Sequence, residues 1–194
     1  YFANYFLHMS DVTFDMQNNR MEVHQRYADP WRVTLVDTGE STATGGRLRR
    51  VREHVKDETF CFTYGDGVSD VNLAELVEFH KTHGRQATLT AIQPPGRFGV
   101  LAIQGTLVTN FHEKPAGDGF WINGGFFVLE PSVLDLLIDD ETVWENSPLK
   151  SLADTGNLVA YRHTGFWYAM DTLRDRVFLE ESWQSGKAPW KVWA

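Results

Sequence analysis

Segments with the periodicity of a β-strand alternate with segments of helical periodicity along most of the 194 residues. Residues 60–64 and 87–93 are short and apolar, with β-branched or aromatic side chains typical of buried strands. Residues 71–83 lie between them, have a helical pattern and end at Gly84, a common helix stop. This strand–helix–strand order favours an α/β fold built on a central sheet.

The other segments extend this pattern and add antiparallel features. Further strands are expected over residues 11–16, 31–39, 119–131 and 157–164, and a hairpin around Gly105. Further helices are expected near residues 1–9, 44–55, 131–138, 147–155 and 172–185, with Thr44 as an N-cap. The hairpin and the glycines within 119–131 indicate a mixed, mostly parallel sheet. We expect one domain over residues 1–194.

Composition limits the classes of function. The chain has 18 Lys and Arg against 26 Asp and Glu, a net charge of −8, which argues against a nucleic-acid or anionic-membrane surface. One cysteine, Cys61, excludes an intrachain disulfide and fits the reducing cytoplasm. No apolar run approaches the roughly 20 residues that span a bilayer. An acidic protein that binds a polyanion would need local Lys or Arg, or a divalent cation.

Two aspartates that follow strand-like segments are candidate metal ligands. Asp66 lies between Gly65 and Gly67, directly after the strand 60–64, and ligands of open α/β sheets bind beyond the carboxyl ends of strands. Asp171 precedes a predicted helix. A pair of carboxylates suits Mg²⁺, which keeps most of its coordination shell for water and phosphate oxygens. Taken alone, Gly-Asp-Gly also fits a turn, and Asp171 also fits a helix N-cap.

Two further motifs are candidates for substrate contacts. Glu113 and Lys114 end a strand-like segment before a proline, where Lys114 could neutralise a phosphate and Glu113 could accept hydrogen bonds from hydroxyls. The alternative is a solvated turn. Asn123 and Gly124 lie inside an apolar strand, where a glycine indicates either a β-bulge or the close approach of a ligand.

The remaining candidates are weaker. Gly45, Gly46 and Arg47 open a basic helix and form a short possible anion site. Neither Gly-x-x-x-x-Gly-Lys-Ser/Thr nor Gly-x-Gly-x-x-Gly occurs. His80 and His83 have no metal-ligand spacing and are expected to face solvent.

Cys61 lies within a strand-like segment. A free cysteine in such a place is expected to be a small core residue rather than a nucleophile.

These motifs, in this order, resemble those of the sugar-nucleotide pyrophosphorylases, a family of nucleotidyltransferases with a Rossmann-like domain. The likeness covers the whole chain and is carried by residues 1–16, 30–39, 62–73, 88–99, 113–131, 170–175 and 185–193. Within the family it is greatest to members that join CTP and glucose 1-phosphate. The resemblance implies Mg²⁺-dependent in-line transfer that yields CDP-glucose and pyrophosphate, for dideoxysugar and O-antigen lipopolysaccharide synthesis.

The resemblance also assigns roles to the candidate residues. Asp66 and Asp171 would hold Mg²⁺ and act in catalysis with Lys114. Substrate binding would involve Glu113, Lys114, Asn123, Gly124, Gly45, Gly46, Arg47 and Gly65.

The resemblance further implies segments beyond the residues considered. A first strand, a glycine-rich phosphate loop and a catalytic lysine are expected to precede Tyr1, which makes these 194 residues an N-terminally truncated domain, inactive alone. A homo-oligomer is expected, with a hexamer among the assemblies of the family. Two alternatives stay open: a glycosyltransferase that uses a nucleotide sugar, and a truncated homologue without catalytic activity.

Overall fold

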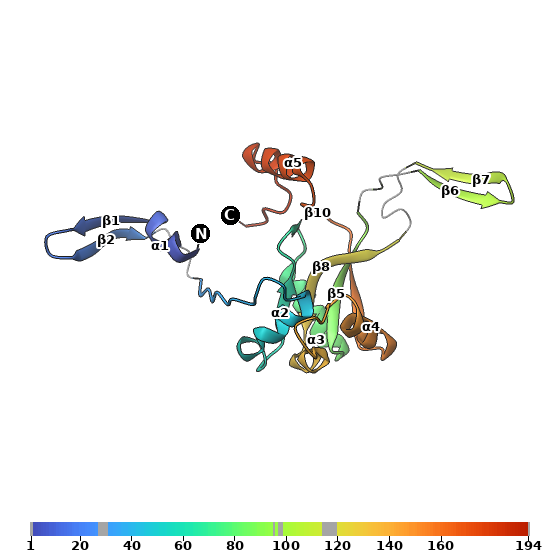
Figure 1. Cartoon of the computed structure of the whole chain (residues 1–194). Helices are drawn as coiled ribbons and strands as arrows, with labels where there is room; N and C mark the ends of the chain where they lie inside the picture. Colours follow the sequence, from blue (N-terminus) through green and yellow to red (C-terminus); the bar gives the residue numbers. More distant parts are fainter. Residues whose placement is uncertain (1, 27–30, 95, 97–98, 114–119, 194) are drawn as a thin grey trace. The chain divides into compact units, whose positions relative to one another are not determined.

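The computed structural model describes residues 2–26, 31–94, 96, 99–113 and 120–193 (Figure 1). The chain separates into two compact units, Tyr1–Asp37 and Thr38–Ala194. Each unit is described by itself, and the single domain expected over residues 1–194 stays a prediction. No helix in the described part of the chain is long and apolar enough to cross a membrane.

The first unit contains a short helix and a β-hairpin. The 3₁₀-helix η1 (Phe2–Asn4) leads into α1 (Tyr5–His8), and β1 (Ser10–Asp15) pairs antiparallel with β2 (Arg20–Arg26). The strand expected over residues 31–39 is wrong, because these residues have neither helix nor strand structure. The apolar side chains in this segment, such as Leu35, are exposed, and no described strand pairs with it.

The second unit is built on a four-stranded mixed sheet. Its order is β3 (Phe60–Thr63), β8 (Ile122–Leu129), β5 (Ala87–Ile92) and β9 (Leu158–His163). β8 is antiparallel to both neighbours and β5 is parallel to β9, so β3, β5 and β9 run in one direction and β8 against them. The expected mixed α/β sheet is therefore confirmed, although two of its three described strand pairs are antiparallel and only β5–β9 is parallel.

Short helices accompany this sheet. They are α2 (Thr44–Arg50), η2 (Arg52–His54), α3 (Leu73–His83), η4 (Pro131–Leu136), α4 (Ser147–Asp154) and α5 (Leu173–Gln184). Helix α3 begins after Asn72, whose side chain accepts two backbone N–H bonds, and it ends at Gly84 with φ of 62°. Helix α2 begins differently from expectation, because its N-cap is Ala43 and Thr44 is its first residue.

One hydrophobic cluster lies on the face of the sheet that carries Phe127, and the opposite face also buries apolar side chains, such as Val128 and Ile92. Phe127 of β8 pairs with Phe62 and with Leu89, and its ring stacks on Phe62 and meets Trp144 edge-on. The buried cluster consists of Leu48, Ala87, Phe127, Leu129, Val133, Leu134, Leu137, Trp144 and Leu152. Cys61 is exposed, so its expected place in the core is wrong: β3 alternates, and Cys61 points away from the face that carries Phe62.

Two small antiparallel pairs complete the second unit. One is the predicted hairpin of β6 (Val100–Gln104) and β7 (Leu107–His112), which turns at Gly105 with φ of 62°. The other joins β4 (Gly67–Ser69) to β10 (Trp167–Ala169). We call this second pair the β4–β10 ribbon, and it carries the candidate site.

Candidate functional site

The β4–β10 ribbon brings together the backbone segments that carry the two candidate metal ligands. Gly67 pairs with Ala169, and beyond this pair the backbone N–H of Met170 donates to the carbonyl oxygen of Asp66 at 2.8 Å. Asp171 follows Met170 directly. Two aspartates that lie 105 positions apart in the sequence therefore meet at the same end of one ribbon.

Both carboxylates are free to accept a ligand. Asp66 and Asp171 are exposed, and within the described residues neither carboxylate has a hydrogen bond or ion pair. The N-cap of α5 is Thr172, which forms a capping box with Asp175, so the N-cap alternative for Asp171 is wrong. The described part of the chain has no group of three or more metal-ligating side chains. Two carboxylates still fit Mg²⁺, which often takes only one or two from the protein.

Tyr64, which the sequence did not single out, organises the neighbourhood of Asp66. Its hydroxyl accepts a hydrogen bond from Nδ2 of Asn123 at 3.2 Å. Burial raises the pKa of Tyr64 well above its usual value, and so do its hydrogen bond to Glu145 and the negative charge of Asp66. The phenol therefore stays protonated and donates to Glu145. The sequence feature that could have identified Tyr64 is its position at the carboxyl end of β3, directly before Gly65, where ligands of α/β sheets bind.

The glycines beside Asn123 form a β-bulge, which was one of the two alternatives for this strand. The β5–β8 register shifts there, and Gly125 has φ of 78°. A Cβ on Gly124 would lie 3.0 Å from the carbonyl oxygen of Thr90, so this glycine allows close strand packing. Oδ1 of Asn123 accepts from the N–H of Gly125 at 2.9 Å, which orients its amide toward Tyr64. Ligand contacts of Asn123 and Gly124 stay a prediction.

Gly45 and Gly46 are buried against the backbone of a neighbouring loop. A Cβ on Gly45 would lie 2.7 Å from the carbonyl oxygen of Thr142, and one on Gly46 would overlap the backbone of Asp140. The N–H of Gly46 is used in a hydrogen bond to Thr142. These contacts account for both glycines by packing, and their role at a nucleotide stays a prediction.

Arg47 and Thr44 extend the contacts of α2. The Arg47 guanidinium donates to Oγ1 of Thr38 at 2.7 Å and to the carbonyl of Glu40 at 2.9 Å. Oγ1 of Thr44 donates to Glu145 at 2.7 Å, and Glu145 is also the partner of Tyr64. A chain of hydrogen bonds thus links the start of α2 to the end of β3. Binding of an anion by Arg47 stays a prediction.

The structure describes two of the last three candidates, Glu113 and Gly65, but not the third. Lys114 lies outside the described residues. Glu113 follows β7, and its Oε2 would lie 3.3 Å from a Cβ on Gly99. Gly65 is exposed, and a Cβ there would meet nothing within 4 Å, so the backbone beside Asp66 faces open space. This space agrees with the approach of a ligand to the backbone, which stays a prediction.

An open hollow of about 710 Å³ adjoins the ribbon. Val68 of β4 and Met170, which bonds to Asp66, form part of its wall. Its other lining residues are Arg176, Leu179, Glu180, Trp183, Gln184 and Trp190.

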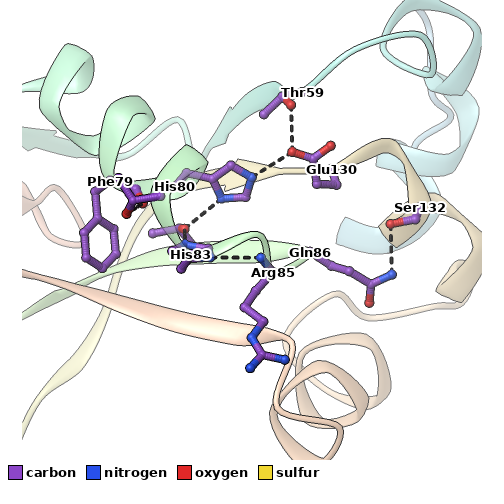
Figure 2. A network of polar contacts seen from close by, with 10 residues as sticks. Thr59, Phe79, His80, His83, Arg85, Gln86, Glu130 and Ser132 are labelled. Atoms are coloured by element: carbon purple, nitrogen blue, oxygen red, sulfur yellow. Dashed lines mark hydrogen bonds and ion pairs between the residues drawn. The ribbon is translucent and has the colours of Figure 1, made fainter.

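A second polar cluster lies at the opposite end of the sheet (Figure 2). His80 is only 2% exposed, and its ring nitrogens lie 2.8 Å from Thr88 and 3.0 Å from Glu130. His83 Nε2 also lies 2.8 Å from Thr88, and Thr59 donates to Glu130 at 2.7 Å. The expected exposure of His80 and His83 is therefore wrong for His80, which is buried, and only partial for His83. The hydroxyl of Thr88 lies on the α3 side of the sheet and is within hydrogen-bond distance of both histidine rings.

Comparisons with known proteins agree on one family. The family model described as nucleotidyl transferase matches residues 10–167. The chain is 64% identical to the glucose-1-phosphate cytidylyltransferase of Salmonella typhi and 40% identical to the probable glucose-1-phosphate cytidylyltransferase of Bacillus subtilis (strain 168). Both alignments cover 100% of this chain and 76% of the relative.

Solved structures show the same fold at low identity. HddC from Yersinia pseudotuberculosis has a TM-score of 0.55 at 19% identity, covering 74% of this chain and 64% of that one. A UDP-glucose pyrophosphorylase complexed with UDP-glucose has a TM-score of 0.55 at 13% identity, covering 77% of this chain and 64% of that one. The chain thus spans somewhat less than two thirds of these solved chains.

Proposed function

Because the chain belongs to the nucleotidyl transferase family, we propose that its protein transfers a cytidylyl group from CTP to glucose 1-phosphate. A phosphate oxygen of glucose 1-phosphate attacks the α-phosphorus of CTP, the bond from that phosphorus to the β-phosphate oxygen breaks, and pyrophosphate leaves. The product is CDP-glucose. The choice of CTP and glucose is supported by the 64% identity to the Salmonella typhi cytidylyltransferase.

The observation that carries the proposal is the meeting of Asp66 and Asp171 at one end of the β4–β10 ribbon. These two carboxylates would hold Mg²⁺. When bound, Mg²⁺ supplies screening between the two anionic substrates and stabilises the leaving pyrophosphate. Since positioning and electrostatics dominate phosphoryl-type transfer, no covalent enzyme intermediate is required.

The other residues have binding roles in this proposal. Gly65 leaves the backbone open for phosphates, and Asn123, held by Tyr64, faces the sugar hydroxyls. Glu113 and Lys114 bind the sugar phosphate. Gly45, Gly46 and Arg47 lie near the nucleotide.

The setting of the reaction is also part of the proposal. We place the enzyme in the cytoplasm, as a homo-oligomer, and in the supply of CDP-glucose for dideoxysugar and O-antigen lipopolysaccharide synthesis. The single cysteine, which excludes an intrachain disulfide, supports the cytoplasmic location.

A coupled assay tests the activity. The protein produced from its complete reading frame is incubated with CTP, glucose 1-phosphate and Mg²⁺, and pyrophosphate and CDP-glucose are measured, with UTP and dTTP as competing nucleotides. We expect pyrophosphate and CDP-glucose in equal amounts, and none after removal of Mg²⁺ with a chelator. A folded protein that forms no pyrophosphate, or that instead passes glucose from a sugar nucleotide to an acceptor, would contradict the proposal.

A further inference from the structure

The end of the β4–β10 ribbon that lies away from Asp66 is clamped to the central sheet. The carbonyl oxygen of Phe166 accepts from the N–H of Asp70 at 3.2 Å and from Oγ of Ser69 at 2.8 Å. His163 Nε2 lies 2.8 Å from Oδ1 of Asp70 and 3.3 Å from the same carbonyl. His163 is the last residue of β9, so this contact ties the ribbon to the main sheet.

We call these contacts of His163, Asp70 and the Phe166 carbonyl the clamp, and its side chains are largely shielded from solvent. The side chains of His163 and Asp70 are 12% and 30% exposed. Oδ1 of Asp70 is buried and, within the described residues, has no hydrogen-bond partner besides the His163 contact. A Cβ on Gly165 would lie 2.7 Å from Cε1 of His163, so the loop between β9 and β10 closes directly over the pair.

The ribbon needs such anchors because it is small. In the described chain β4 and β10 pair with each other alone, over three residues each. An isolated two-stranded ribbon is marginally stable at best in water. A second anchor lies at the same end, where Nε1 of Trp167, the first residue of β10, donates to the carbonyl of Gly124 at 2.7 Å.

We propose that His163 is a positioning residue for the cation site: through Asp70 it fixes the ribbon whose far end presents Asp66 and Asp171. The inference rests on the proposed function. At about 3.4 Å per residue, the four steps along the strand from Asp70 to Asp66 separate the clamp from this carboxylate by roughly 14 Å. His163 therefore acts through the backbone and not by contact with the cation. Loss of the clamp lets the two aspartates move apart and weakens the cation affinity.

Binding of Mn²⁺ as a spin-active substitute for Mg²⁺ tests the inference without an activity assay. The free-Mn²⁺ signal is titrated by electron paramagnetic resonance with the full-length protein. We expect His163→Leu to weaken Mn²⁺ affinity by up to about tenfold, the lower end of the loss caused by removing a direct hydrogen-bond partner of a metal ligand, because His163 acts through the backbone. His163→Gln keeps an N–H donor at the reach of Nε2, so it should restore most of the affinity. Gly165→Ala, which keeps His163 but crowds the pair, should weaken the affinity again.

His80→Leu is the matched control, because it removes another buried histidine at the opposite end of the sheet. We expect it to lower the melting temperature without changing Mn²⁺ affinity. Unchanged Mn²⁺ affinity in folded His163→Leu and Gly165→Ala, together with loss of binding in Asp66→Asn, would overturn the positioning role alone. Equal Mn²⁺ binding by wild type and Asp66→Asn would instead overturn the metal site of the proposed function.

Discussion

The polar side chains at the two ends of the central sheet differ in burial and in hydrogen bonding. At the amino ends of β3 and β5, His80, His83 and Glu130 share hydrogen bonds with Thr59 and Thr88 (Figure 2). At the carboxyl end of β3, the carboxylates of Asp66 and Asp171 are exposed and lack such partners among the described residues.

This difference in hydrogen bonding indicates that one end of the sheet contributes mainly to stability and the other mainly to activity. A buried polar group must be hydrogen-bonded, because leaving it unpaired costs about 1–3 kcal/mol. An exposed carboxylate is solvated by water and needs no protein partner, so it is available to a ligand at little cost in stability. We therefore expect substitutions at the His80 end to change stability and substitutions at the Asp66 end to change activity.

The largest effect is expected from Asp66→Asn. Removal of the charge should lower the rate of pyrophosphate formation by about 10²–10³-fold, or roughly 3–4 kcal/mol in activation free energy. The free energy of unfolding should stay within about 0.5 kcal/mol of wild type, since the side chain is exposed. Initial rates and urea unfolding measure the two quantities. Asp154→Asn, at another exposed aspartate, is the control and should keep its activity.

His80→Leu should give the opposite result. It leaves Thr88 and Glu130 without their shared partner and should lower the free energy of unfolding by about 2–3 kcal/mol. The rate per folded molecule should remain that of wild type. Urea unfolding and rates at a permissive temperature are the measurements. A variant with wild-type stability and lost activity would contradict the assignment of stability to the His80 end and activity to the Asp66 end.

Two glycine substitutions sharpen the contrast. Gly46→Ala places a Cβ against the backbone of Asp140 and should destabilise the protein by about 1–3 kcal/mol through overpacking. Gly65→Ala faces open space and should change stability by less than about 0.5 kcal/mol, while hindering the approach of phosphates. Thermal unfolding and the KM for CTP distinguish them. The reverse assignment of effects would show that Gly65, and not Gly46, is the structural glycine.

The smallest effect is a pH dependence from His83. Burial, with the nearby charges of His80 and Arg85, lowers the pKa of His83 in the folded protein, and its Nδ1 accepts from the N–H of Arg85. The unfolded chain, with a histidine pKa of about 6.5, therefore binds this proton more readily. Stability should fall as the pH drops through that value.

Urea unfolding at pH 7.5 and pH 5.5 checks this sign. The loss between the two values should be smaller in His83→Asn, whose Oδ1 can still accept from Arg85. A loss that is unchanged in this variant would assign the pH dependence to other histidines.

Much of the fold follows from periodicity in the sequence. The pattern over residues 71–83 predicted α3, because Asn72 and Gly84 mark its ends chemically. The segment 31–39 has a strand pattern yet forms no strand, because a strand requires a neighbour and the described chain supplies none. His80 was misjudged because a histidine counts as polar in the helical pattern, whereas its partners Thr88 and Glu130 come from the sheet.

The candidate site was predictable only in part. Asp66 was indicated by its flanking glycines and its place after β3. The ribbon that joins it to Asp171 was not visible, since three-residue strands such as Gly67–Ser69 have too few positions to show a period. Tyr64 and Glu145 were missed because their pairing is a tertiary contact across 81 positions.

The most direct test of a shared cation site is a double-mutant cycle on pyrophosphate formation by the full-length protein. Rates are measured for Asp66→Asn, Asp171→Asn and the double variant at saturating CTP and glucose 1-phosphate. If both carboxylates hold one Mg²⁺, either substitution disables the site, and the double variant should lose little more than each single variant. Losses that multiply in the double variant would show that the two aspartates act independently, and would contradict the account.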